Sequence, residues 1–211
     1  QKAKHLIVGL ELDLNEKWTV NVEGYLKDFG QLINLNRNKL HEDNLYSEEI
    51  ADELKKDFIV ESGLAKGVDF LVKYNNQNTS LWMVYSLGKI TKTDAFGTYA
   101  PHYDRRHNIN IVASQVFGKD QSWTFDMRWN YGSGFPFTET QGYYENVNFE
   151  DGIATEVTDS NDELGVYYSD YNLGQMPSYH RLDASIKKQI KFSKNSILET
   201  SFGISNVYNR A

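Results

Sequence analysis

The sequence of 211 residues contains a histidine and carboxylate group whose spacing could support metal chemistry. His102, Asp104 and His107 lie close together in one expected link between strands. Zinc, however, needs three or four ligands that converge and are themselves held by further hydrogen bonds. We expect instead that Asp104 pairs with Arg105 or Arg106, because an arginine fork matches a carboxylate. We therefore predict no metal site.

Residues 139–177 contain two further candidate groups. Residues 159–163 gather the oxygen ligands that calcium prefers but lack the glycine and spacing of a calcium loop, which favours a solvated acidic tip. Aromatic faces beside Asp and Asn acceptors suit a sugar or a peptide. The alternative is that these rings pack the long loop onto its neighbours. The ligand-binding candidates are Tyr143, Tyr144, Phe149, Tyr167, Tyr168 and Tyr171.

Catalysis has no support in the sequence. We find no Ser/His/Asp constellation, no phosphate-binding glycine loop and no carboxylate pair on a recognisable catalytic frame. Cysteine is absent, which excludes disulfides and thiolate metal sites from this chain. We expect no catalytic residue, no cofactor and no enzymatic activity.

The net charge of −7 is concentrated in two segments. Residues 139–177 carry nine acidic residues and neither lysine nor arginine, and residues 36–62 carry eight acidic against four basic residues. This pattern is not the basic patch of a nucleic-acid binder. If both segments are loops at one rim, that rim is acidic, which suits glycans, peptides or cationic chelates better than highly anionic ligands.

The elements that would position these groups are strands with one apolar face. Residues 123–131 alternate large apolar or aromatic side chains with Thr, Asp, Arg and Asn, so their two faces differ sharply. Alternation of this kind recurs and predicts eight strands, at 4–14, 17–35, 64–75, 80–97, 105–118, 122–138, 178–192 and 196–208. Charged side chains on the polar face are expected to line the wall interior, namely Asp126, Arg128, Arg181, Asp183 and Lys187.

The links between these strands are short and long in turn, as in outer-membrane barrels. Short turns are expected at 15–16, 75–79, 118–121 and 193–195, and longer segments at 36–63, 98–104 and 139–177. One helix is expected inside the first long segment, with Ser47 as its cap and Phe58 ending its apolar stripe. No apolar run approaches the roughly 18 residues of a spanning helix. The pattern predicts an all-β, antiparallel transmembrane barrel wall.

The order of motifs along the chain resembles the C-terminal half of the barrel of a TonB-dependent outer-membrane receptor, of the kind abundant in Bacteroidetes. The matching stretches are His5–Leu12, Val22–Ile33, Gly63–Lys73, Trp82–Lys89, Tyr103–His107, Asn130–Phe137, Tyr179–Asp183 and Ser205–Asn209. The resemblance implies that residues 1–211 are part of a plugged barrel of about 22 strands. Its N-terminal plug and closing strand would lie outside this sequence. The charged residues on the polar face are expected to contact the wall and that plug.

The resemblance also implies a function and partners. The protein would import a siderophore, glycan or peptide across the outer membrane of a Gram-negative bacterium, with energy from the TonB complex. Its partners would be the lipid bilayer and lipopolysaccharide, its own plug and the TonB complex. The resemblance is also compatible with a surface lipoprotein lid as a further partner. Two alternatives remain open: a complete eight-stranded barrel that acts as an anchor or adhesin, and a soluble, lipocalin-like carrier with its apolar face inward.

Overall fold

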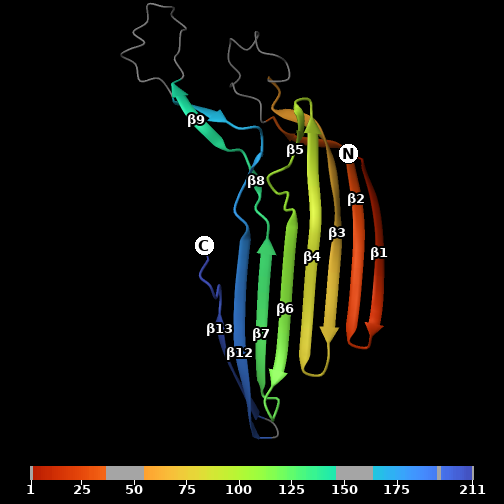
Figure 1. The fold of residues 1–211 in the computed structure, drawn as a ribbon, viewed down its shortest axis with the longest axis vertical. Coiled ribbons are helices and arrows are strands. Elements are labelled where there is room, and N and C mark those ends of the chain that lie inside the picture. The colour runs from red at the N-terminus through yellow and green to blue at the C-terminus, as the bar shows by residue number, and fades with distance from the viewer. Residues whose placement is uncertain (1, 37–54, 146–163, 194–195, 211) are drawn as a thin grey trace, which may run out of the picture.

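The computed structural model describes residues 2–36, 55–145, 164–193 and 196–210, and in them the chain is all-β and antiparallel (Figure 1). Eight long strands form one sheet in the order of the chain: β1 (Ala3–Asn15), β2 (Trp18–Leu35), β3 (Phe58–Asn75), β4 (Thr79–Asp94), β6 (His107–Phe117), β7 (Trp123–Gly132), β12 (Tyr179–Ser193) and β13 (Ser196–Ile204). The short β5 (Gly97–Tyr99) pairs with β4. The predicted fold class is confirmed. Within these ranges, no helix is long and apolar enough to cross a membrane.

The register places apolar side chains in rows that cross the whole sheet. One row contains Leu12, Val20, Val72, Met83, Ile111, Trp129 and Leu182. A parallel row contains Trp18, Tyr74, Leu81, Ala113, Met127, Ala184 and Ile204. We call the side that bears these rows the apolar face. A one-residue slip of any strand would move its row to the other side, so the apolar pattern fixes the register.

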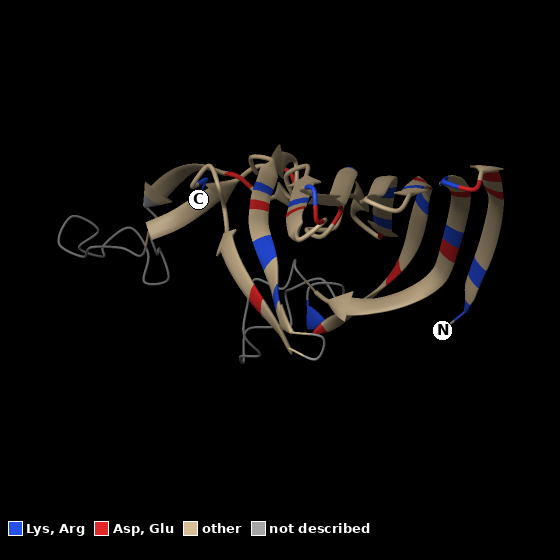
Figure 2. Ribbon diagram, turned by 90° about the horizontal axis from the view of Figure 1, so that it is seen from below, with Lys and Arg blue, Asp and Glu red and all other residues tan. Residues whose placement is uncertain are grey.

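The rows between them have a different composition and define the polar face. The row next to the first one contains Asp13, Thr19, Lys73, Trp82, Val112, Arg128 and Asp183. Four of its seven members are charged, so this face suits water or polar partners. Seen from below in Figure 2, the sheet is curved, and charged residues occur along most of its strands.

The described part of the chain has no apolar core of the kind that soluble domains build. Tyr99, at 8% exposure, is its only buried hydrophobic residue. Phe125 on the apolar face is 41% exposed, while Trp123 and Trp129 beside it are half-buried. The apolar face is therefore not enclosed by another layer of these residues.

Short turns gather at one end of the sheet and long segments at the other (Figure 1). The turns after β1, β3 and β6 each have only a few residues, as the sequence predicts. In the last of them, the Ser122 hydroxyl donates to Asp120 Oδ1 at 2.8 Å, and this hydrogen bond lowers the pKa of Asp120. Gln121 accepts a positive φ of 51° in the same turn.

Several boundaries differ from those predicted. β3 begins at Phe58 instead of residue 64, so Phe58 opens a strand and does not end a helix; the rest of the predicted helix falls mainly outside the described residues. β4 ends at Asp94, whose carboxylate accepts the backbone N–H groups of Phe96 and Gly97 and turns the chain into β5. The long strand predicted to reach residue 138 stops at Gly132.

The segment predicted as a long loop between β7 and β12 contains short strands. β8 (Pro136–Phe137) pairs with β11 (Gly174–Gln175), and β9 (Thr140–Glu145) pairs with β10 (Leu164–Tyr168), in both cases antiparallel. Figure 1 shows β9 and β8 continuing beyond the long-segment end of the sheet. This part of the chain therefore extends outward from the wall as a narrow ribbon.

Candidate functional site

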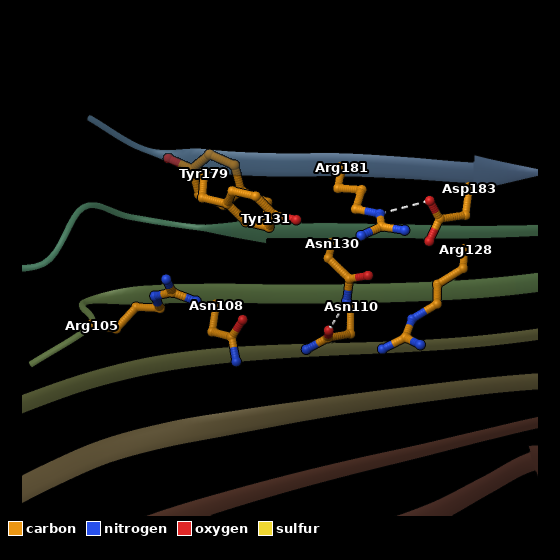
Figure 3. A pocket seen from close by; sticks show the side chains of 9 residues that line it. All are labelled: Arg105, Asn108, Asn110, Arg128, Asn130, Tyr131, Tyr179, Arg181 and Asp183. Atoms are coloured by element: carbon orange, nitrogen blue, oxygen red, sulfur yellow. Dashed lines mark hydrogen bonds and ion pairs between the residues drawn. The ribbon is translucent and has the colours of Figure 1, made fainter. Parts of the chain in front are cut away.

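The candidate site is a group of polar side chains where β6, β7 and β12 run side by side. Cross-strand pairing places Asn110, Asn130 and Arg181 in one row on the polar face. The neighbouring row contributes Arg128 and Asp183. Residues two apart on a strand share a face. Polar residues at every second position of three adjacent paired strands therefore lie next to one another. Figure 3 shows these side chains gathered over the three strands.

Two interactions within the group fix its geometry. The Asn130 amide donates to the Asn110 carbonyl oxygen across the strands. Arg181 Nε donates to Asp183 Oδ1 at 2.7 Å, and the same oxygen accepts the backbone N–H of Asn206 at 2.8 Å. Asp183 is therefore engaged by two donors, which leaves it little capacity to neutralise a further cation.

Arg105 closes the group at the end where the long segments begin. Its guanidinium lies over the Phe135 ring at 4.2 Å from the ring centre, a cation–π arrangement. Arg105 can occupy this position because residue 132 is a glycine: a Cβ on Gly132 would lie 2.6 Å from the guanidinium carbon of Arg105. Arg105 Nε is buried and has no hydrogen-bond partner among the described residues.

These side chains surround a cavity of about 470 Å³ on the polar face. Its lining consists of Arg105, Asn108, Asn110, Arg128, Asn130, Tyr131, Tyr179, Arg181 and Asp183. Three guanidiniums face one carboxylate, so the cavity has an excess of positive charge and of hydrogen-bond donors. No described residue forms an ion pair with Arg128, whose side chain is exposed. Chemically, the cavity can bind an acceptor-rich group and offers no nucleophile and base in contact.

The charged residues predicted on the polar face are found there, as two ion pairs and a third cation, Arg128, that lies opposite Asp183. Lys187 Nζ lies 2.9 Å from Asp126 Oδ2, below the cavity in the direction of the short turns. Arg181 pairs with Asp183, and Arg128 lies directly opposite Asp183 in the register without forming an ion pair among the described residues. The asparagines and Arg105 were missed, although the alternation that places Arg128 inward also places Asn130 inward. Arg105 was predicted as the first residue of the strand at 105–118, but β6 begins at His107, so the alternation of that strand does not determine its position.

The histidines near residue 104 do not form a metal site. Asp104 Oδ1 accepts a backbone N–H of β4 at 2.8 Å. Asp104 Oδ2 lies 3.8 Å from Arg106 Nη2, so the predicted pairing with an arginine is present, at a long distance for an ion pair. His107 Nδ1 is 2.9 Å from the Tyr85 hydroxyl, whereas His102 packs against a tyrosine ring. Among the residues that the structure covers, no group of three or more such ligands could hold a metal. Residues 159–163 lie outside the described residues.

The predicted aromatic ligand surface does not converge on this cavity. Tyr143, Tyr144, Tyr167 and Tyr168 lie on β9 and β10 and are between 52% and 66% exposed. Cross-strand pairing places Tyr144 and Tyr167 on one side of this ribbon and Tyr143 on the other. Phe149, the remaining member besides Tyr171, falls outside the described residues. The exposed tyrosines are therefore divided between the two sides of the β9–β10 ribbon, and none of them lines the polar cavity.

Tyr171 instead packs against a buried polar cluster at the long-segment end of the sheet. Glu61 is 2% exposed, and its Oε1 accepts the Tyr99 hydroxyl at 2.6 Å and the Asn34 amide at 2.9 Å. Lys92 Nζ lies 2.9 Å from Glu61 Oε2. The Tyr99 ring then meets the Tyr171 ring edge-on, with the centres 4.9 Å apart. We call Asn34, Glu61, Lys92 and Tyr99 the Glu61 cluster; it anchors the outer segment to the wall.

Comparison with known proteins identifies the fold but no close relative. No protein-family model matches the sequence, and no curated protein is similar to it. Among solved structures, the chain is similar to the ferripyoverdine receptor of the outer membrane of Pseudomonas aeruginosa, which was crystallised with ferripyoverdine, with a TM-score of 0.58 at 13% identity. The similarity covers 99% of this chain and 23% of the receptor. The chain therefore has the fold of a stretch of the β-barrel wall of an outer-membrane receptor.

Proposed function

We propose that this chain is a wall segment of a transport receptor in the outer membrane of a Gram-negative bacterium. The receptor imports a ligand of the siderophore, glycan or peptide class with energy from a TonB-type complex, and it performs no catalysis. One observation carries the proposal: an apolar face crosses all eight long strands and is not covered by any other layer of the described residues. In this arrangement the apolar face contacts lipid and the polar face lines the interior.

The extent of the apolar face along the strands agrees with a bilayer. On β7 the face runs from Trp123 to Tyr131, and the eight steps between these two residues rise about 27 Å along the strand. At the usual strand tilt of about 40° this corresponds to about 20 Å of height, close to the apolar band of about 25 Å in outer-membrane barrels. Aromatic residues at both ends match the girdles of such barrels.

Charged residues mark the limits of this band. At the short-turn end, Phe117 stacks with Trp123 on the apolar face, and Lys188 Nζ lies 4.4 Å from the centre of the Trp123 ring. At the other end, Lys66 and Lys89 face each other across β3 and β4, both exposed on the same side. Lysines at these heights can extend into the headgroup regions, whereas at mid-height they would be costly.

The structural similarity supports the barrel and leaves the remaining parts to this proposal. The chain spans 23% of the similar receptor, so the rest of the wall, the plug and the TonB contact belong to the proposed complete protein. The Bacteroidetes type, with its surface lipoprotein lid, rests on the motif resemblance. Lipopolysaccharide would surround the wall on the outer side.

The two alternatives agree less well with the sheet. In a complete eight-stranded barrel β1 would pair with β13, but within the described residues these strands form the two free edges of an open sheet. A lipocalin-like carrier would enclose its apolar face, whereas Leu6, Val8 and Phe202 on that face are more than 60% exposed. Both observations favour a segment of a larger wall.

Fractionation of a Gram-negative host that expresses the full-length protein tests the proposal. We expect the protein in the outer membrane, with gel mobility that changes on heating, as folded barrels show. Uptake of a labelled ligand should stop when the energy-coupling complex is deleted. Recovery of the protein in the soluble fraction would contradict the membrane assignment, and uptake that is unchanged without the complex would contradict the coupling.

A further inference from the structure

We infer that the cavity on β6, β7 and β12 binds a carboxylate-bearing small molecule, which names the ligand class of the receptor proposed above and rests on that proposal. The argument begins with a count of donors and acceptors. Arginine has five N–H donors and no acceptor, and three arginines line the cavity. The single carboxylate, Asp183, is already held by Arg181 and by a backbone N–H.

The guanidinium that forms no ion pair among the described residues is that of Arg128, although Asp183 lies directly opposite it on β12. It is exposed on the polar face, and the structure gives it no ion pair within the described ranges. The same face offers carboxylates to other cations: Asp126 pairs with Lys187 and Asp183 with Arg181. Arg128, which lies between these pairs on β7, is left as the cation available to a bound molecule.

A second unsatisfied donor lies at the opposite end of the cavity. Arg105 Nε is buried without a partner among the described residues, although stacking on Phe135 fixes the position of its guanidinium. A buried donor without an acceptor destabilises the structure, because its lost hydrogen bonds to water are not replaced. A ligand that brings an acceptor to this end would remove that destabilisation, so Arg105 and Arg128 together favour a molecule with acceptors at both ends.

The dimensions of the cavity agree with a small molecule. The rows of Asn108 and Arg128 are four residues apart along the strands, about 13 Å, and β6 and β12 lie two strand spacings apart, about 10 Å. The volume of about 470 Å³ lies within the usual range of ligand sites, about 300–1,000 Å³. The cavity is lined at one end by residues next to the end of β7 and the start of β12, on the side of the long segments. In the proposed orientation an external ligand arrives from this side.

Carboxylate is favoured because a planar fork binds it through two parallel hydrogen bonds. The acidic composition of the long segments argues against a highly anionic ligand. The cavity itself, with three arginines and one carboxylate, favours an anionic group. A ligand with one or two carboxylates meets both conditions, since the arginines compensate for its charge at close range while the acidic segments discourage polyanions.

Saturation-transfer NMR on the full-length receptor in detergent tests the inference, with succinate as the probe and the neutral succinamide as its uncharged analogue. Wild type should show saturable transfer to succinate and little to succinamide. Arg128→Gln should raise the apparent dissociation constant at least about tenfold, because it removes a charge-assisted pair. Lys73→Gln, which removes an exposed cation from the same face on β3, should leave binding unchanged.

The outcomes separate this inference from the proposed function. Because Arg128 is exposed, its replacement should spare the fold, and a heat-dependent shift in gel mobility checks this. Equal binding by wild type and Arg128→Gln, or no transfer to succinate in either, overturns the carboxylate site. Neither result would affect the membrane location, which the fractionation experiment decides independently.

Discussion

Replacement of Glu61 by alanine should loosen the junction between the wall and the outer segment. The side chain of Glu61 has no exposed surface, and that of Lys92, its ion-pair partner at 2.9 Å, is 13% exposed. Removing one partner of a buried ion pair typically costs about 3–5 kcal/mol, because the other charge is left uncompensated. Lys92 retains some contact with water, so we expect a loss below this range, about 2–3 kcal/mol.

This loss should appear as faster hydrogen exchange in β5. The backbone of β5 pairs with β4 directly opposite Lys92, and Tyr99 loses its acceptor in the same substitution. A decrease of about 2–3 kcal/mol in the free energy of local opening corresponds to exchange that is faster by about 30- to 150-fold. Mass spectrometry of the full-length receptor can measure this in the peptide covering residues 97–99.

Three variants distinguish this reasoning from general damage to the sheet. Glu61→Gln keeps the oxygen that accepts from Tyr99 and should have a smaller effect. The double variant Glu61→Ala with Lys92→Ala should recover much of the protection, because no charge remains unpaired. Glu11→Ala removes an exposed carboxylate of the same face and should leave β5 unchanged. Exchange in Glu61→Ala within about twofold of wild type would refute the reasoning.

Two further predictions concern the faces of the sheet and the outer segment. Val72→Arg on the apolar face should destabilise the barrel in lipid by about 2–4 kcal/mol, while Val84→Arg on the polar face should cost less than about 1 kcal/mol. Denaturant titration of the protein in vesicles measures both losses, and equal losses would contradict the assigned faces. Gly134→Ala should break the contact of β8 with β11, since a Cβ there would lie 1.5 Å from the Met176 carbonyl oxygen. Gly142→Ala, which meets nothing within 4 Å, is the control; similar hydrogen exchange at Met176 in both variants would count against this packing.

The long strands could be predicted from sequence because their information is local. Alternation such as that of residues 123–131 assigns both the strand and its faces, and cross-strand pairing then confirms the rows. The first residues of β3, before residue 64, could not be predicted in this way. Glu61 and Gly63 resemble loop residues there, and the burial of Glu61 depends on Lys92, which is 31 positions away.

The candidate site was predicted in part for the same reason. Arg128, Arg181 and Asp183 were placed on the polar face by their parity alone. Their assembly into a cavity depends on the register of three strands and on Arg105, which precedes its strand and is held by Phe135. The aromatic surface of β9 and β10 was predicted by composition, but composition does not indicate which rings share a side of the ribbon.

The most direct test of the account is the environment of two neighbouring positions on opposite faces. Spin labels placed by Val72→Cys and Val84→Cys in the full-length receptor in lipid bilayers report access to oxygen, which concentrates in lipid, and to a water-soluble nickel complex. We predict that the label at Val72 relaxes mainly with oxygen and that at Val84 mainly with nickel. A label at Val72 that relaxes mainly with nickel, or is shielded from both reagents, would contradict a lipid-facing wall.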